Sequence, residues 1–152
     1  MKEVYYIYNN EAIASTTFLS ILQKIENLDV SRACLILPFL FEDSMARALK
    51  RLHVTPTYSL EQFMAENPRL FVSFNKRYLS LLPVMINSLM ILENTGQIKI
   101  GKNITCTSLL NIDGNESLGE RFLVIEDAIP NLLFLLEQKT TVQLYKTLNV
   151  QL

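Results

Sequence analysis

The residues that could perform acid–base or metal chemistry are few and scattered in this 152-residue sequence. His53 is the only histidine, and the two cysteines, Cys34 and Cys106, lie far apart. A zinc site needs cysteines and histidines at short characteristic spacings, which these three residues lack. General acid–base catalysis needs further polar groups around a histidine. We therefore expect His53 to be a surface residue that closes a helix, where a cation is mildly favoured.

The carboxylates and glycines do not form a catalytic or nucleotide-binding motif either. The adjacent pairs Glu42-Asp43 and Glu126-Asp127 would point about 100° apart on a helix, so neither pair converges on one point. The four glycines form no GxGxxG or GxxxxGK[ST] motif, and GxSxG is absent. Cys34 is embedded in Ala-Cys-Leu-Ile-Leu, which is typical of a buried thiol. We predict a protein that is not an enzyme, with no catalytic residues, metal or cofactor.

The basic residues form small groups, and the net charge of −1 gives no overall attraction to DNA. Lys76-Arg77 is a pair within a long apolar stretch, where base readout would need Arg, Lys, Asn and Gln along an exposed face. Backbone phosphates can still attract isolated cations, so DNA contact is expected to be weak or indirect. The candidate nucleic-acid contacts are Arg47, Lys50, Arg51, Lys99 and Lys102.

The chain is more apolar than its size requires. Apolar residues make up 49% of it and charged residues 19%, and the mean hydropathy is +0.20. A chain of this length cannot bury them all, so a membrane or a partner must cover the excess. The longest unbroken apolar run, Ala33–Phe41, is shorter than the roughly 18 to 20 residues that cross a bilayer. The composition therefore favours a protein partner and no membrane.

Three tyrosines near the N-terminus are candidate partner-binding residues. Tyr5, Tyr6 and Tyr8 belong to a β-branched and aromatic stretch, Val4–Tyr8, which we expect to form a short extended arm. Tyrosine is enriched at interfaces, but these side chains could equally pack on the chain's own core. Residues 1–12 lack an apolar signal core followed by a cleavage site, so a cytoplasmic location is expected.

The elements that must position these residues are mostly helices. Apolar spacing predicts a helix over Glu11–Leu28, and Pro38 interrupts the next apolar stretch, in which Leu35–Leu37 fits either a helix or a buried strand. A helix over Asp43–Leu52 precedes a loop at His53–Tyr58. Ser59 with Gln62 forms a capping box for a short helix, and a long helix from Pro68 to Glu93 should kink near Pro83.

The C-terminal half continues with a hairpin and two further helices. Gly96 is expected to cap the long helix in a left-handed conformation, and alternating residues over 97–108 predict a β-hairpin. Asn111–Asn115 is predicted to be a loop, after which Ser117 and Glu120 are expected to form a second capping box. The helix from Leu118 should bend or restart at Pro130, and Thr140 or Thr141 should cap a last helix that ends near Leu148.

These elements predict a predominantly α fold with a small β-hairpin (α+β). A helix followed at once by a hairpin is winged-helix-like in outline. No repeat, linker or low-complexity segment divides the chain. We therefore expect a single domain over residues 1–152, with possible sub-lobes at 1–58 and 59–152.

The order of apolar segments resembles a known family. The quoted segments are LILPFLFEDSMARAL (residues 35–49), the stretch from Ser59 to Ile100, and KTLNV (residues 146–150). From Tyr8 to Val150 they are similar to the middle component of bacterial three-component ABC defence systems, of which the Lamassu type is the best known. Members often close with a Leu-Gly-Val-like step, where this chain has Leu148-Asn149-Val150.

The resemblance implies a function without catalytic residues. A middle component would lie between an SMC- or Rad50-like ABC ATPase and an effector, often a nuclease, in an anti-phage or anti-plasmid complex. It would hold the effector inactive and pass on a signal when the ATPase engages foreign DNA. A winged-helix DNA-binding regulator is the alternative that the helix and hairpin leave open.

Overall fold

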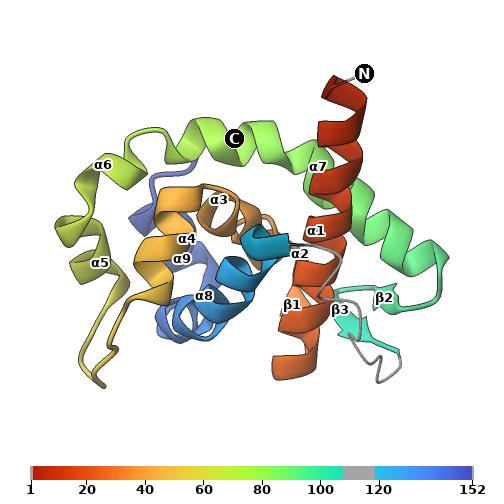
Figure 1. The fold of residues 1–152 in the computed structure, drawn as a ribbon. Coiled ribbons are helices and arrows are strands. Elements are labelled where there is room, and N and C mark those ends of the chain that lie inside the picture. Colours follow the sequence, from red (N-terminus) through yellow and green to blue (C-terminus); the bar gives the residue numbers. More distant parts are fainter. Residues whose placement is uncertain (1, 108–118, 152) are drawn as a thin grey trace.

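Helices dominate the fold, and one small sheet lies at the side of the molecule (Figure 1). The computed structural model describes the backbone of residues 2–107 and 119–151, and the side chains of residues 10–107 and 119–151. The predicted loop at Asn111–Asn115 and the predicted cap at Ser117 lie outside these residues. The helices are α1 (Lys2–Lys24), α2 (Val30–Ala33), α3 (Ile36–Leu40), α4 (Asp43–Lys50), α5 (Leu60–Glu66), α6 (Pro68–Phe71), α7 (Phe74–Asn94), α8 (Gly119–Glu137) and α9 (Thr141–Thr147).

The first helix is longer at its start than the sequence predicted. α1 begins at Lys2, so the extended arm predicted for Val4–Tyr8 is wrong. Asparagine and β-branched residues cost at most about 0.7 kcal/mol each inside a helix, which is too little to stop a helix that continues into buried turns. α1 ends at Lys24, and Leu28–Asp29 forms a short strand, β1.

The apolar run in the middle of the first half forms the centre of the core. For Leu35–Leu37 the sequence left a helix or a buried strand open, and the structure has a helix. α3 spans Ile36–Leu40, and its residues are buried. Pro38 lies in the first turn of α3, where the missing N–H donor of proline is tolerated. The Phe39 ring packs edge-on against the rings of Phe71 and Phe74, with centroids 6.0 Å and 4.9 Å away.

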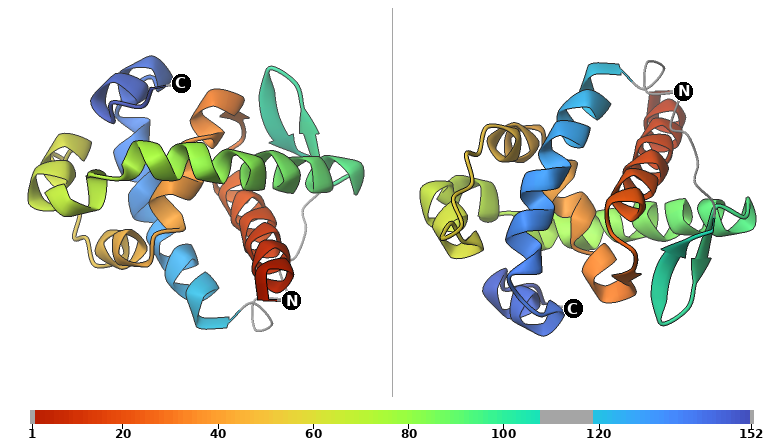
Figure 2. Two further views of the ribbon diagram at one scale, coloured as in Figure 1. Left: turned by 90° about the horizontal axis from the view of Figure 1, so that it is seen from above. Right: turned by 90° about the horizontal axis from the view of Figure 1, so that it is seen from below.

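The predicted long helix from Pro68 divides earlier than expected. It breaks at Val72-Ser73, between α6 and α7, and α7 runs through Pro83 as one helix. The break is stabilised by a side chain from α7, since the Arg77 guanidinium donates to the Leu70 carbonyl over 2.9 Å. Seen from above and from below, α7 crosses α1 and α8 on one side of the molecule (Figure 2).

The hairpin is confirmed, and a third strand joins it. β2 (Ile98–Ile100) and β3 (Asn103–Cys106) pair antiparallel, and β1 adds to the other edge of β3 to give the order β1-β3-β2. Gly96 has a φ of +75°, as its predicted role in closing α7 requires. The fold is therefore mainly helical with a small antiparallel sheet, as predicted. Two residues are too few for a strand signal, so β1 was missed.

The last two helices fold back onto the first half of the chain. α8 continues through Pro130 as one helix, so the alternative that the helix restarts there is wrong, and the bend stays a prediction. The Asn131 side-chain amide donates to the Leu49 and Leu52 carbonyls at the end of α4. Thr140 caps α9, and Gln143 completes a capping box. In the described residues, none of the helices is long and apolar enough to cross a membrane.

Candidate partner-binding surfaces

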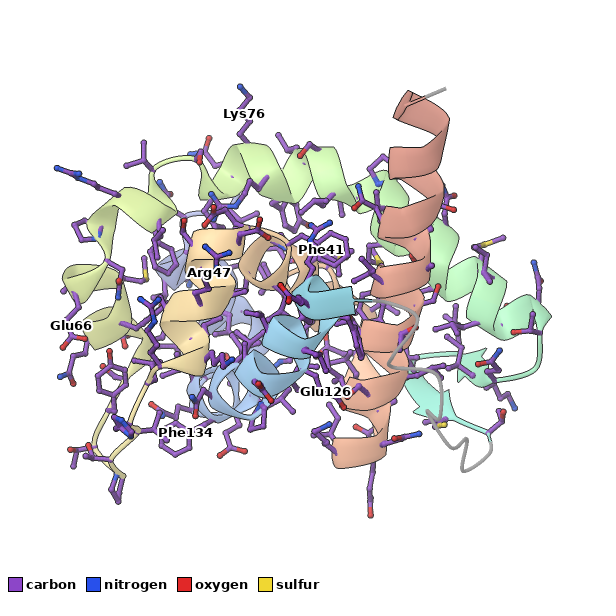
Figure 3. All side chains as sticks on the ribbon, viewed as in Figure 1. Phe41, Arg47, Glu66, Lys76, Glu126 and Phe134 are labelled. Carbon is purple, nitrogen blue, oxygen red and sulfur yellow. The ribbon has the colours of Figure 1, made fainter. Side chains whose placement is uncertain are left out.

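One face of α7 carries apolar side chains that no described element covers. Leu79, Ile86 and Met90 are 48%, 51% and 53% exposed. Their spacing of seven and four residues places them on one side of the helix, with the exposed Pro83 between them. Lys76, one turn before Leu79, points away from the rest of the molecule (Figure 3). We call Leu79, Pro83, Ile86 and Met90 the α7 outer stripe.

The opposite face of α7 supplies the core, so the helix is apolar on two sides. Its buried residues are Phe74, Tyr78, Met85, Ser88, Leu89 and Leu92. The inner face is the one that packs on α1 and α3. A surface helix normally places polar residues opposite its buried face. The outer stripe therefore marks α7 as a helix that is suited to being covered from outside.

A groove of about 660 Å³ opens between α2, α7 and α9. Val30, Ser31 and Cys34 line it from α2 and the residue that follows that helix, and Tyr78 lines it from α7. The remaining lining residues belong to α9 and the chain after it: Thr141, Val142, Tyr145, Lys146, Asn149 and Val150. Its volume lies within the range of about 300 to 1,000 Å³ that is typical of ligand pockets.

Hydrogen bonds hold the polar groups of this groove in place. The Tyr145 hydroxyl donates to the Ser31 carbonyl over 2.6 Å and lies 3.1 Å from the Tyr78 hydroxyl. Burial raises the pKa of the Cys34 thiol, although hydrogen bonds with Tyr145 and Tyr78 oppose this shift. Burial likewise raises the pKa of Tyr145. The thiol is therefore neutral at pH 7, which is unfavourable for a nucleophile.

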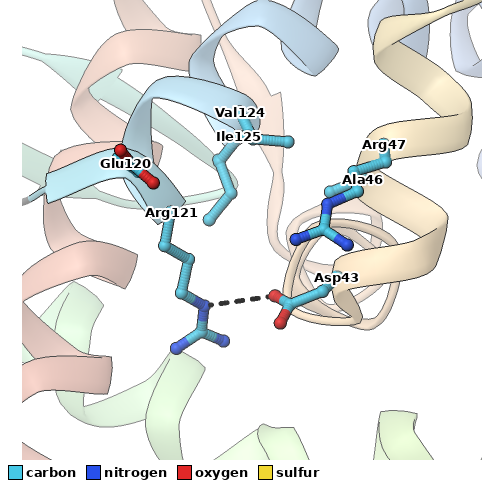
Figure 4. Close-up of a pocket in the computed structure, with 7 residues that line it drawn as sticks. All are labelled: Asp43, Ala46, Arg47, Glu120, Arg121, Val124 and Ile125. Atoms are coloured by element: carbon cyan, nitrogen blue, oxygen red, sulfur yellow. Dashed lines mark ion pairs between the residues drawn. The ribbon is translucent and has the colours of Figure 1, made fainter.

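A smaller pocket of about 200 Å³ lies where α4 meets the start of α8 (Figure 4). The Arg121 guanidinium lies 3.6 Å from the Asp43 carboxylate and stacks over the Phe41 ring at 4.9 Å. Arg47 and Glu120 also line this pocket. Two arginines and two carboxylates thus line the pocket, and their formal charges cancel. This pocket offers no net charge to an ionic ligand.

The predicted nucleic-acid contacts fall into two separate groups. Arg47, Lys50 and Arg51 lie at α4, and Lys50 forms an ion pair with Asp127 at 3.4 Å. The remaining two, Lys99 and Lys102, belong to the hairpin, and the figures place α4 and the hairpin on opposite sides of the molecule (Figures 1 and 2). The two groups therefore do not form one basic cluster. Their roles as weak contacts stay predictions.

The other candidate residues do not assemble into a chemical site. The backbone of Tyr5, Tyr6 and Tyr8 lies in α1, but their side chains lie outside the described residues, so their role as partner anchors stays a prediction. His53 lies exposed in the loop after α4. Among the side chains of residues 10–107 and 119–151, no three His, Cys, Asp or Glu residues come together as metal ligands would.

Neither the α7 outer stripe nor the groove beside α9 was predicted from the sequence, and the reason is the same for both. The spacing of the α7 outer stripe is visible in the sequence, but the core residues of α7 interleave with it. On the last helix, Val142 is 66% exposed whereas Leu144 is buried. Helical periodicity finds one apolar face reliably only when the other face is polar. The excess of apolar residues in α7 was the one signal in the sequence that could have predicted an exposed apolar face.

Comparison with known families gives a match over nearly the whole chain. A family model described as "ABC-three component (ABC-3C) system Middle Component 3" matches residues 2–152. No curated protein and no solved structure matches the chain.

Proposed function

This chain belongs to the middle component 3 family of ABC-three component systems, and from that premise we propose that it is a non-catalytic adaptor of a defence complex. Membership implies that the other components of the system are its partners. In the proposal, the chain bridges an SMC- or Rad50-like ABC ATPase and an effector, for example a nuclease, in a Lamassu-like anti-phage or anti-plasmid system. It helps to keep the effector inactive until the ATPase engages foreign DNA.

The observation that carries this proposal is the α7 outer stripe. Three large apolar side chains about half exposed on one helix face are costly in water, since each Å² of apolar surface removed from water stabilises by about 25 cal/mol. A partner surface that covers Leu79, Ile86 and Met90 would recover this free energy. The same stripe argues against α7 as a DNA-reading helix, because base edges are read by polar side chains.

The experiment is co-purification of the three components encoded together, with a tag on this chain. We expect the native chain to retain both the ATPase and the effector. In the double variant Ile86→Glu/Met90→Glu, two carboxylates would have to be buried against the partner. Because burying an unpaired charge is strongly unfavourable, we expect this variant to lose at least one component.

The matched control is Leu123→Glu, which introduces the same charge at a leucine that is 52% exposed on α8. We expect Leu123→Glu to retain both components, and thermal melts to show that all variants fold. Full retention of both components by the double variant, or equal loss from Leu123→Glu, would contradict the proposal. The bridging role predicts in addition that a tagged effector captures the ATPase only when this chain is present.

A further inference from the structure

We propose that the groove between α2, α7 and α9 binds a polypeptide segment that inserts apolar side chains and pairs one carboxylate with Lys146. This binding site lies apart from the α7 outer stripe. It does not depend on the adaptor role, because the groove would bind such a segment whichever protein supplies it.

The apolar part of the inference rests on the two edges of the groove. Val142 on α9 is 66% exposed and Val30 on α2 is 37% exposed, and both line the cavity. Val150 and the rings of Tyr78 and Tyr145 line it as well. Aromatic and aliphatic side chains around a concave site are the usual receptors for the apolar anchors of a bound segment.

The groove is already formed in the unbound chain. The Asp29 carboxylate accepts from the Arg32 backbone N–H and from the Thr141 hydroxyl, both over 2.7 Å, which ties the start of α2 to the start of α9. The Arg32 guanidinium donates to the Leu136 carbonyl over 3.1 Å and to the Thr141 hydroxyl over 3.2 Å. A site held open in this way loses little conformational entropy when a ligand binds.

The charge of the groove indicates which polar group the bound segment should carry. Lys146 is the only charged residue among those that line the groove, and in the described part of the chain no ion pair involves it. The nearby Asp29 and Arg32 are engaged with each other and with Thr141, so their charges largely cancel. A carboxylate beside an apolar side chain therefore complements the groove, whereas a single cation is too little for a nucleic-acid backbone.

The test is a selection of random 12-residue peptides displayed on phage against the full chain. We expect enriched peptides to combine apolar residues with Asp or Glu. Selection against Lys146→Glu should enrich Lys and Arg in place of the acidic residues, since the charge in the groove is reversed. The matched control is Lys76→Glu, which reverses an exposed lysine on α7 outside the groove and should leave the acidic preference unchanged.

A second variant tests the apolar contact. Val142→Ser should weaken binding of the best peptide about tenfold in fluorescence anisotropy, because much of a buried valine contact is lost. Val72→Ser, at an 86% exposed valine outside the groove, should leave affinity unchanged. Both valines are exposed, so folding should persist, as circular dichroism would verify.

Three outcomes would overturn the inference. One is enrichment of the same acidic peptides by Lys146→Glu, and another is unchanged affinity in Val142→Ser. The third is the absence of any enriched peptide together with saturable binding of dodecanoate, which would assign the groove to a small amphiphile. The α7 variants leave the groove intact, so failure here is distinguishable from failure of the adaptor role.

Discussion

Arg77 and Lys76 are neighbours in the sequence, but only Lys76 behaves as a surface cation. The Arg77 guanidinium donates to the Pro38 carbonyl over 3.2 Å, to the Ser73 hydroxyl over 2.9 Å and to the Leu70 carbonyl over 2.9 Å. It also lies over the Phe74 ring at 5.4 Å. Burial lowers the pKa of Arg77, but arginine stays protonated at neutral pH. This side chain therefore joins α3, the end of α6 and the start of α7.

Replacing Arg77 with methionine should destabilise the fold by about 2 kcal/mol. The change leaves the half-buried carbonyls of Pro38 and Leu70 without this donor, and a buried group that loses its partner costs about 1–3 kcal/mol. Urea unfolding measures the effect. Lys76→Met is the control and should shift stability by less than about 0.5 kcal/mol, as exposed substitutions usually do. Equal stability of the two variants would show that the hydrogen bonds of Arg77 contribute nothing net.

Asn149 lies at the step where the resemblance noted from the sequence leads us to expect glycine. Its φ is +54°, and the N–H of Val150 bonds to the Tyr145 carbonyl over 3.1 Å, which closes α9 in a left-handed turn. Glycine adopts this conformation most easily, and asparagine is the next choice. Asparagine in a Leu-Asn-Val step can therefore adopt the left-handed conformation that glycine would adopt in a Leu-Gly-Val step.

At the scale of elements, two of the polar contacts that join α4 to α8 are expected to differ in strength. The Asn131 amide donates to the Leu49 carbonyl over 2.7 Å and to the Leu52 carbonyl over 3.2 Å. The second contact is the ion pair between Lys50 and Asp127, in which both side chains are about half exposed. The amide satisfies carbonyl groups that the end of a helix leaves free, whereas an exposed ion pair is largely solvated.

Asn131→Leu should therefore cost about 1–2 kcal/mol of stability, because two helix-end carbonyls lose a donor. Asp127→Asn, which removes only the exposed ion pair, should cost less than about 0.5 kcal/mol. Chemical denaturation of the two variants gives the comparison. A larger loss from Asp127→Asn would mean that the ion pair, and not the amide, holds α4 against α8.

At the scale of the whole molecule, packing crosses the boundary between the two possible sub-lobes. α1 packs on α7, and α4 packs on α8, so each contact joins residues from 1–58 to residues from 59–152. β1 pairs with β3 across the same boundary. Since each half buries its apolar residues against the other, we expect residues 1–152 to unfold as one unit.

Equilibrium unfolding in urea tests this expectation. Circular dichroism and tyrosine fluorescence should give coincident transitions, as they do when a domain unfolds in two states. A fragment of residues 1–58 should not fold alone, because the faces of α1 and α4 that pack on α7 and α8 would be exposed. Two separate transitions, or a folded fragment with a cooperative melt, would instead support two sub-lobes.

Much of the helical part of this fold could be predicted from the sequence, because its signals are local. Ser59 caps α5, Thr140 caps α9 and Gly96 closes α7, each through groups only a few residues away. The hairpin follows from alternation over adjacent strands. The extended arm predicted for Val4–Tyr8 was wrong, because it relied on a weak local preference that the surrounding helix overrides. The kink near Pro83 stays a prediction.

By itself, the sequence determined most of the element types, the lack of a recognised catalytic motif and an excess of apolar residues. The order of its apolar segments also indicated the middle-component family, which the family match confirms. Only the tertiary structure decided where the excess lies, on the outer face of α7 and along the groove beside α9. It also decided that Arg77 is partly buried between helices and that β1 joins the hairpin. The physical reason is that exposure and strand pairing depend on contacts between residues far apart in the chain, which local periodicity does not encode.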